Sequence, residues 1–321
     1  MKSKSIYRPL FLEAWQTVWQ HKRLWLVGIF ATAMASGGLF ESLSGNWQTA
    51  LTGRKLLEQL INGTLPGYTW LVTYSSLLAR LEPFHQYLLA TLILLIVAAI
   101  IIIGAVAQGA LFAGALEKKP STFRELIKMG RHFFGRVLWL DILGKIGLGV
   151  VFLITVVPVA FLNPLPYSWH KYPPFISLIL FLTGAIFITV LQMLAMTGVV
   201  RKHLNVRGAI VEAWNIFRFH ILVTFELGIL LFATSLLAIL ATLILLIVLA
   251  IPITILFIIA SLIGSTVIYG LSIIISITLV IAVILLVSGF LNAFQYTVWS
   301  LFFEEAGRFG IVPLIKKIIR R

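Results

Sequence analysis

The sequence predicts an all-α integral membrane protein, a six-span helical bundle built from three repeats of an interfacial amphipathic helix followed by two transmembrane helices. Of its 321 residues, 60% are hydrophobic and only 11% are charged, which leaves too little polar surface to cover a soluble globule of this size. A related amphipathic segment precedes the first, third and fifth of six apolar runs. These runs have membrane-spanning length, lack the period-two alternation of a transmembrane β-barrel, and lie at roughly 24–40, 87–116, 137–161, 174–200, 221–250 and 268–303.

The positive charge of the chain indicates its topology. There are 25 Lys and Arg against 11 Asp and Glu, and the basic residues cluster before residue 24, in 117–136, in 200–220 and after 303. The positive-inside rule then predicts a multi-pass protein of the cytoplasmic (inner) membrane, with both termini and all three amphipathic helices in the cytoplasm. Such clusters favour anionic membrane lipids as partners, beside a protein partner in the membrane, and we expect no nucleic acid binding. The absence of cysteine excludes disulfides and thiol chemistry.

The chain is expected to form a single membrane domain, 1–321, whose first repeat unit covers about 8–116. Its amphipathic helix, FLEAWQTVWQH, places apolar residues on one helical stripe and polar residues opposite. The Ala-Met-Ala triplet after the start of the first span resembles a signal-peptidase site, which leaves open whether residues 1–35 are cleaved. The polar segment 41–86 is expected to be an outer loop. Small residues at four-residue steps in the second span favour close helix contact.

The second unit, about 120–200, begins with an amphipathic helix around Glu125. Thr122 and Glu125 have the spacing of a capping box, so the helix is expected to start there. The third span follows, and the short link 162–173 is rich in Pro, Trp and Tyr, which is typical of a membrane boundary. The fourth span ends at Val200.

The third unit, about 206–303, begins with IVEAWNIFRFH, the segment that most resembles the first amphipathic helix. Residues 221–303 contain no Lys or Arg and lie between two flanks predicted to be cytoplasmic, so they cross the membrane an even number of times. Two long spans match the other units, and four short spans are the alternative. A basic tail, 304–321, closes the chain.

Three glutamines inside the apolar runs repeat with the units. Gln108, Gln192 and Gln295 each lie nine residues before the first charged residue after their span. Polar side chains are costly in a bilayer, so each is a candidate functional residue. They are predicted to form hydrogen bonds between helices; alternatively, they converge and line a polar vestibule open to the cytoplasm.

Charged residues within the spans form the second group of candidates. Asp141 and Lys145 stand four residues apart, which predicts an ion pair near the cytoplasmic boundary or, alternatively, part of a transport site. Glu226 lies just inside the fifth span, where Arg218, His220 and Lys145 are its candidate partners.

Aromatic and basic side chains of the amphipathic helices form the third group. They suit interfacial anchoring and packing, and the alternative is a site for lipid headgroups. The candidates are Trp15, Arg131, Trp214, Arg218 and His220.

Motifs of known enzymes are missing from the sequence. It contains no zinc-protease, nucleophile-elbow, phosphate-loop or dinucleotide-binding motif, and no two histidines have metal-ligand spacing. We therefore expect no catalytic residues, cofactor or metal. The sequence favours a non-enzymatic protein that acts on lipid or a partner, as a scaffold or membrane-homeostasis factor. The alternative is a transporter or channel for ions or small molecules that uses the intramembrane polar residues.

The repeated unit resembles poorly characterised bacterial membrane families, which include the membrane domain attached to some glycerophosphodiester phosphodiesterases and the related YciC-like proteins. The resemblance rests on Glu13-Ala14-Trp15 and Glu212-Ala213-Trp214, each placed shortly before a span. The second unit departs from this pattern. The resemblance implies a six-span protein of the cytoplasmic membrane without an established reaction.

Overall fold

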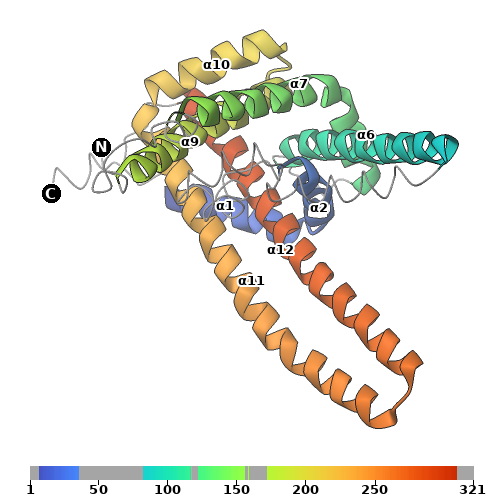
Figure 1. Ribbon diagram of the computed structural model, residues 1–321. Helices are drawn as coiled ribbons and strands as arrows, with labels where there is room; N and C mark the ends of the chain where they lie inside the picture. Colours follow the sequence, from blue (N-terminus) through green and yellow to red (C-terminus); the bar gives the residue numbers. More distant parts are fainter. Residues whose placement is uncertain are drawn as a thin grey trace.

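The secondary structure of the chain is helical throughout the part that the computed structural model describes, namely residues 7–35, 82–115, 117, 122–155, 158 and 172–308 (Figure 1). Glu82 precedes the helix Pro83–Gly114, whose first turn contains Pro83, a residue without an N–H that would need an acceptor there. The helices are α1 (Tyr7–Gln20), α2 (Arg23–Ala35), α6 (Pro83–Gly114), α7 (Phe123–Thr155), α9 (Tyr172–Arg201), α10 (Val206–Phe219), α11 (Ile221–Ile263) and α12 (Thr266–Arg308).

Five of these helices, α6, α7, α9, α11 and α12, are long and apolar enough to cross a membrane. The first predicted span is shorter within the described residues, because α2 has 13 residues and the rest of the run, 36–40, lies outside them. The predicted outer loop 41–86 and tail 304–321 also lie mostly outside the described residues.

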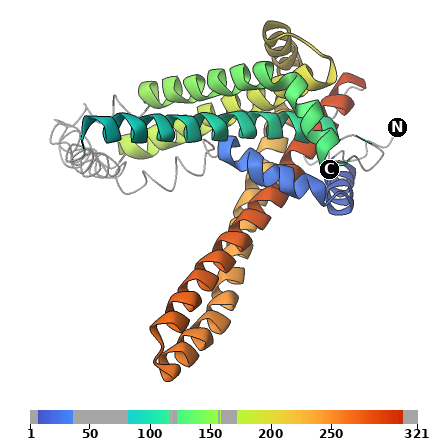
Figure 2. The ribbon, with the colours of Figure 1, turned by 90° about the vertical axis from the view of Figure 1, so that its right-hand side faces the viewer.

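The helix α7 differs from the prediction of a separate amphipathic helix and span. It is a single helix of 33 residues that covers both. Its start has the predicted capping box, in which the Thr122 amide donates to Glu125 Oε2 at 2.6 Å and the Glu125 amide donates to Thr122 Oγ1 at 3.3 Å. No proline follows to interrupt the backbone hydrogen bonds, so the helix continues into the apolar run. Figure 2 shows that α7 bends after its first turns instead.

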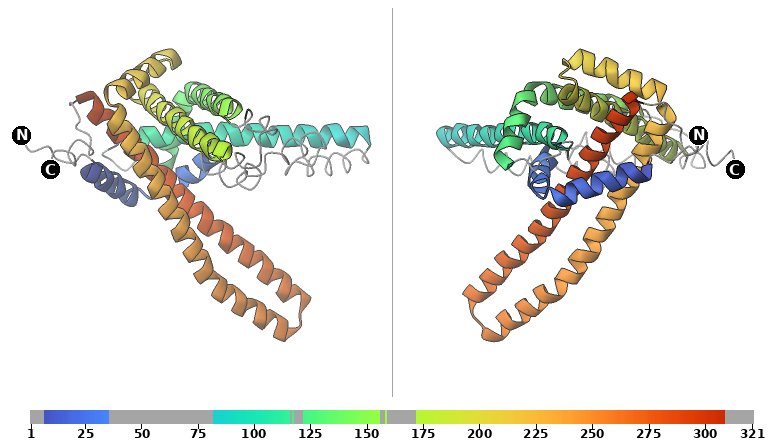
Figure 3. Two further views of the ribbon diagram at one scale, coloured as in Figure 1. Left: turned by 60° about the vertical axis from the view of Figure 1, so that its left-hand side comes forward. Right: turned by 180° about the vertical axis from the view of Figure 1, so that it is seen from behind.

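The last third of the chain forms one long hairpin. Each of α11 and α12 has 43 residues, which corresponds to a length of about 65 Å. Gly264 ends α11 with a φ of 69°, a left-handed conformation that glycine adopts without strain. Pro252 lies within α11 without ending it. Figure 3 shows from two sides that this hairpin extends obliquely away from the other helices.

Each helical hairpin packs against the next, and the last one packs against the first. Three hairpins, α2–α6, α7–α9 and α11–α12, pack against one another through α6 and α7, through α9 and α10, and through α12 with α1 and α2. Two crossings bring backbones together: a Cβ on Gly130 would lie 2.1 Å from the Val106 carbonyl oxygen, and one on Gly289 would lie 2.5 Å from the Trp25 carbonyl oxygen. Such crossings require glycine.

The core lies where α6, α9 and α12 meet near their carboxyl ends. Most residues of 104–115, 194–200 and 293–303 are buried, whereas the opposite ends of these helices expose mainly apolar side chains. A bilayer would cover those apolar surfaces. The buried ends therefore form the common centre that positions the polar residues described next.

Candidate functional site

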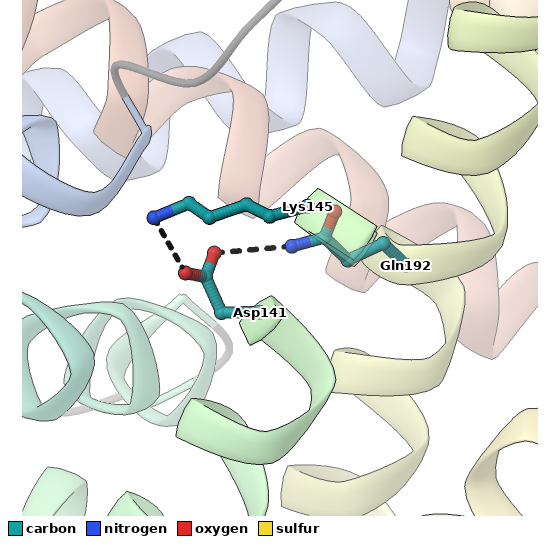
Figure 4. Close-up of polar contacts among 3 residues, drawn as sticks. All are labelled: Asp141, Lys145 and Gln192. Carbon is teal, nitrogen blue, oxygen red and sulfur yellow. Dashed lines mark hydrogen bonds and ion pairs between the residues drawn. The ribbon is translucent and has the colours of Figure 1, made fainter. Parts of the chain in front are cut away.

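Asp141, Lys145 and Gln192 form a polar cluster between α7 and α9 (Figure 4). Lys145 Nζ lies 2.9 Å from Asp141 Oδ2, one helical turn away. Gln192 Nε2 donates a hydrogen bond to Asp141 Oδ1 at 3.2 Å. Both carboxylate oxygens are thus engaged, one by an ammonium group and one by an amide.

The two charges of this cluster lie in different surroundings. The side chain of Asp141 is 4% exposed, whereas that of Lys145 is 44% exposed. A buried carboxylate requires both a countercharge and hydrogen bonds to offset its desolvation, and Asp141 has both. The long apolar stem of Lys145 lets its charge reach outward while it stays paired. The cluster can therefore hold a charge between two helices, with Oδ1 hydrogen-bonded to Gln192 and Oδ2 paired with the Lys145 charge.

A glycine makes room for the amide of Gln192. A Cβ added to Gly144 would lie 2.2 Å from Gln192 Oε1 and 2.4 Å from Gln192 Cδ. Gly144 stands three residues after Asp141 on the same helix, so the side chain that binds Asp141 passes directly over it. The cluster therefore depends on a residue without a side chain.

The other two predicted glutamines lie apart from this cluster. Gln295 Nε2 of α12 donates to Ser235 Oγ of α11 at 2.7 Å. Gln108 of α6 is buried next to Tyr296 of α12, whose ring packs on Phe112. Gln192 and Gln295 each bond to the other helix of their own hairpin.

Glu226 has a partner that the sequence did not indicate. The Tyr7 hydroxyl donates a hydrogen bond to Glu226 Oε2, and this bond joins α1 to α11. No sequence pattern pointed to Tyr7, because the two residues are 219 positions apart. The bond ties the first amphipathic helix to the third hairpin.

The candidate interfacial residues lie on or beside three separate helices, α1, α7 and α10, and do not form one cluster of side chains. Trp15 of α1 stacks on Trp19 and meets Phe290 edge to face, with centroids 5.8 and 5.0 Å apart. Trp214 of α10 stacks on Phe217 at 6.1 Å. Trp15, Trp214, Arg131 and Arg218 are exposed, whereas His220 is the residue that caps α10. Figure 2 shows α1, the first turns of α7 and α10 at the same end of the molecule.

A group of contacts that joins α7, α9, α10 and α12 around the end of α9 was not predicted. Lys202 Nζ lies 2.5 Å from Glu212 Oε1, and Arg201 Nη1 lies 3.7 Å from Glu304 Oε1. Arg136 Nη1 donates to the carbonyl oxygen of His203 at 3.2 Å, where the backbone adopts a φ of 52°. The run of basic residues after α9 was a possible signal, but its acidic partners lie far along the chain.

The described residues were also compared with the ligand sets that hold metal ions. Across those residues, no three His, Asp or Glu side chains gather as a metal site would require. The polar cluster between α7 and α9 consists of an ion pair and an amide.

The fold and these residues define a class: a multi-pass α-helical membrane protein with polar contacts between its helices. Comparisons with protein-family models, curated proteins and solved structures find no match, so the particular family is not assigned.

Proposed function

We propose that this protein is a non-enzymatic scaffold or homeostasis factor of the cytoplasmic membrane, which binds anionic lipid or a membrane partner through basic amphipathic helices on the inner surface. The observation that supports it best is the set of exposed basic side chains in and beside α1, the start of α7 and α10, close to exposed tryptophans. This set comprises Arg8, Lys22, Arg23, Arg124, Lys128, Arg131, Arg207 and Arg218.

The amphipathic helices suit a position at the lipid headgroups. In α10, Ala209, Ala213 and Phe217 are buried against the bundle, while Arg218 and Trp214 are exposed. Tryptophan prefers the membrane boundary, and each Lys or Arg near an anionic surface contributes about 1 kcal/mol to binding. A helix held in this way presents its charges to phosphate groups.

We further propose that the bundle is a ring of three units, each an amphipathic helix followed by a membrane hairpin, with six crossings. Supporting this, the second helix of each hairpin packs on the first elements of the following unit: α6 on α7, α9 on α10, and α12 on α1 and α2. In this scheme α2 continues into the first span. Membership of the families that the repeat resembles stays a prediction.

The competing proposal is a transporter or channel. The observation in its favour is the presence of an ion pair and amides inside apolar helices, at Asp141, Lys145 and Gln192. Those groups bind each other, which favours a structural role. Native mass spectrometry of the purified protein separates the proposals, because a reproducible bound small molecule other than lipid would support transport.

The lipid proposal is tested by the thermal midpoint in nanodiscs of phosphatidylcholine alone or with phosphatidylglycerol. We expect a higher midpoint with the anionic lipid. The double variant Arg207→Gln/Arg218→Gln loses part of this increase, because two charges on α10 are removed. Its matched control, Arg207→Lys/Arg218→Lys, keeps the charges and the increase. Equal midpoints of the unchanged protein in both lipids would contradict lipid binding.

A further inference from the structure

A polar stripe on α12 connects α6 to α9 through the centre of the bundle. Tyr296, Ser300 and Glu304 follow one another at four-residue steps, so they share one face of α12. At the deep end, the Tyr296 ring packs on Phe112 and its hydroxyl lies next to the amide of Gln108. At the cytoplasmic end proposed above, Glu304 pairs with Arg201 of α9. The stripe is two turns long, about 12 Å.

The polar atoms along this stripe are buried but lack hydrogen bonds. Gln108, Tyr296 and Ser300 are only 2%, 1% and 0% exposed. Among the residues with described positions, none forms a hydrogen bond with Gln108 Oε1, the Tyr296 hydroxyl, Ser300 Oγ, or Nε and Nη2 of Arg201. Asp141 Oδ2 also lacks a hydrogen bond, but it lies in an ion pair with Lys145. Buried polar groups are nearly always paired, either with protein or with ordered water, so the unpaired atoms that α6, α12 and α9 contribute here indicate a ligand.

The chemistry of these groups indicates which ligand they suit. The amide oxygen of Gln108 only accepts hydrogen bonds, the guanidinium of Arg201 only donates them, and the two hydroxyls do both. The ligand must therefore be small and able to donate and accept. The positive charge of Arg201 would repel a free cation, and the negative charge of Glu304 would repel a free anion. A neutral molecule is therefore favoured. Water has these properties and commonly links buried polar groups in this way.

We propose that Gln108, Tyr296, Ser300 and Arg201 bind a file of ordered water that reaches from the Arg201–Glu304 pair into the centre of the bundle. This site is separate from the lipid-binding surface.

X-ray hydroxyl-radical footprinting in ¹⁸O-labelled water tests this proposal on the full chain in nanodiscs. Radicals form from bound water where it lies, so we expect Tyr296 to be oxidised several-fold faster than Phe302. Phe302 is an equally buried aromatic residue of the same helix, 0% exposed. Each rate is normalised to that of the unfolded chain. Oxidation of Tyr296 as slow as that of Phe302 would show a dry site and overturn the proposal.

A pair of serine variants supplies the control. Ser300→Ala removes one water ligand and is expected to lower the oxidation of Tyr296 several-fold. Ser276→Ala, on the same helix, removes a buried hydroxyl that already donates to the Ser272 carbonyl oxygen at 2.7 Å, and should leave Tyr296 unchanged. A higher thermal midpoint for Ser300→Ala, with unchanged oxidation of Tyr296, would mean that the hydroxyl is merely unpaired and would contradict the water file.

Discussion

Gly144 determines whether the Asp141 cluster can form. The amide of Gln192 lies over this residue and binds Asp141 from there, so any side chain at position 144 competes with the amide for the same space. The amide cannot retreat and still reach Asp141 Oδ1, because the bond already measures 3.2 Å. A carboxylate buried inside a bundle depends strongly on each of its partners.

The first prediction follows at this scale. Gly144→Ala should lower the free energy of unfolding by about 1–3 kcal/mol, through the lost hydrogen bond and the crowding. The control is Gly149→Ala on the same helix, where an added Cβ meets no atom within 4 Å. There the better helix propensity of alanine should leave stability unchanged or raise it by up to about 1 kcal/mol. Denaturation in mild detergent measures both; equal effects would show that Gln192 has another position available.

Residues of the site were only partly predictable. The four-residue spacing of Asp141 and Lys145 is a local pattern, so their pairing follows from helix geometry alone. The third member, Gln192, stood out by its position in the span, but its bond to Asp141 depends on how two helices pack. Ser300 stood out only as the small residue five positions after Gln295, and Tyr296 was not singled out, because a single Tyr in an apolar run is an ordinary feature.

Helix crossings hold the third hairpin against the first unit. At the crossing of α2 and α12, Gly28 and Gly289 face each other, and a Cβ on Gly28 would lie 2.1 Å from the Gly289 carbonyl oxygen. Nearby, Asn292 Nδ2 donates to Thr32 Oγ1 at 2.8 Å. Close backbone approach increases the van der Waals contact on which helix association in lipid depends.

The second prediction concerns this crossing. Gly289→Ala places a methyl group against the Trp25 carbonyl oxygen, at 2.5 Å, and backbone cannot yield as a side chain can. We expect a loss of roughly 3 kcal/mol in stability. Gly270→Ala, also in α12, points into open space and serves as the control. Thermal unfolding followed by circular dichroism compares them, and a Gly289→Ala protein as stable as Gly270→Ala would contradict the tight crossing.

Elements were predicted better where apolar runs were long. The run 87–116 corresponds to Pro83–Gly114 and the run 174–200 to Tyr172–Arg201, because about 20 apolar residues in a row mark a span directly. In the second unit one continuous helix, α7, covers both the predicted amphipathic helix and the predicted span, and its sequence contains no proline that would mark a break. For 221–303, two long helices with one turn at Gly264 agree with the prediction of two long spans and not with the alternative of four short ones.

The arrangement of the whole molecule rests on contacts between distant segments. The bond from Tyr7 to Glu226 and the packing of α12 on α1 and α2 bring both ends of the described chain together. Repeat spacing suggested three similar units, but it contains no information on which unit touches which. Which units are neighbours depends on how the side chains of different helices pack together, and a single sequence does not show this packing.

The last prediction tests topology, and the chain is well suited to it because it contains no cysteine. Single cysteines at Arg218 and at Ser265, next to the hairpin turn, should react with a membrane-impermeant maleimide from opposite sides of the membrane. The control is a cysteine at Ile247, midway along α11, which lipid should protect. Labelling of both Arg218→Cys and Ser265→Cys from the same side would contradict a hairpin that crosses the bilayer.

The long hairpin has a consequence for how the protein reaches its final state. From Leu227 to Phe303 there is no ionisable Asp, Glu, Lys, Arg or His side chain, and the turn at its far end consists of small residues. Its delivery into the bilayer therefore moves no formal charge through the hydrocarbon. The membrane potential exerts little force on this segment, so we expect its final orientation to depend on the positive residues that flank it.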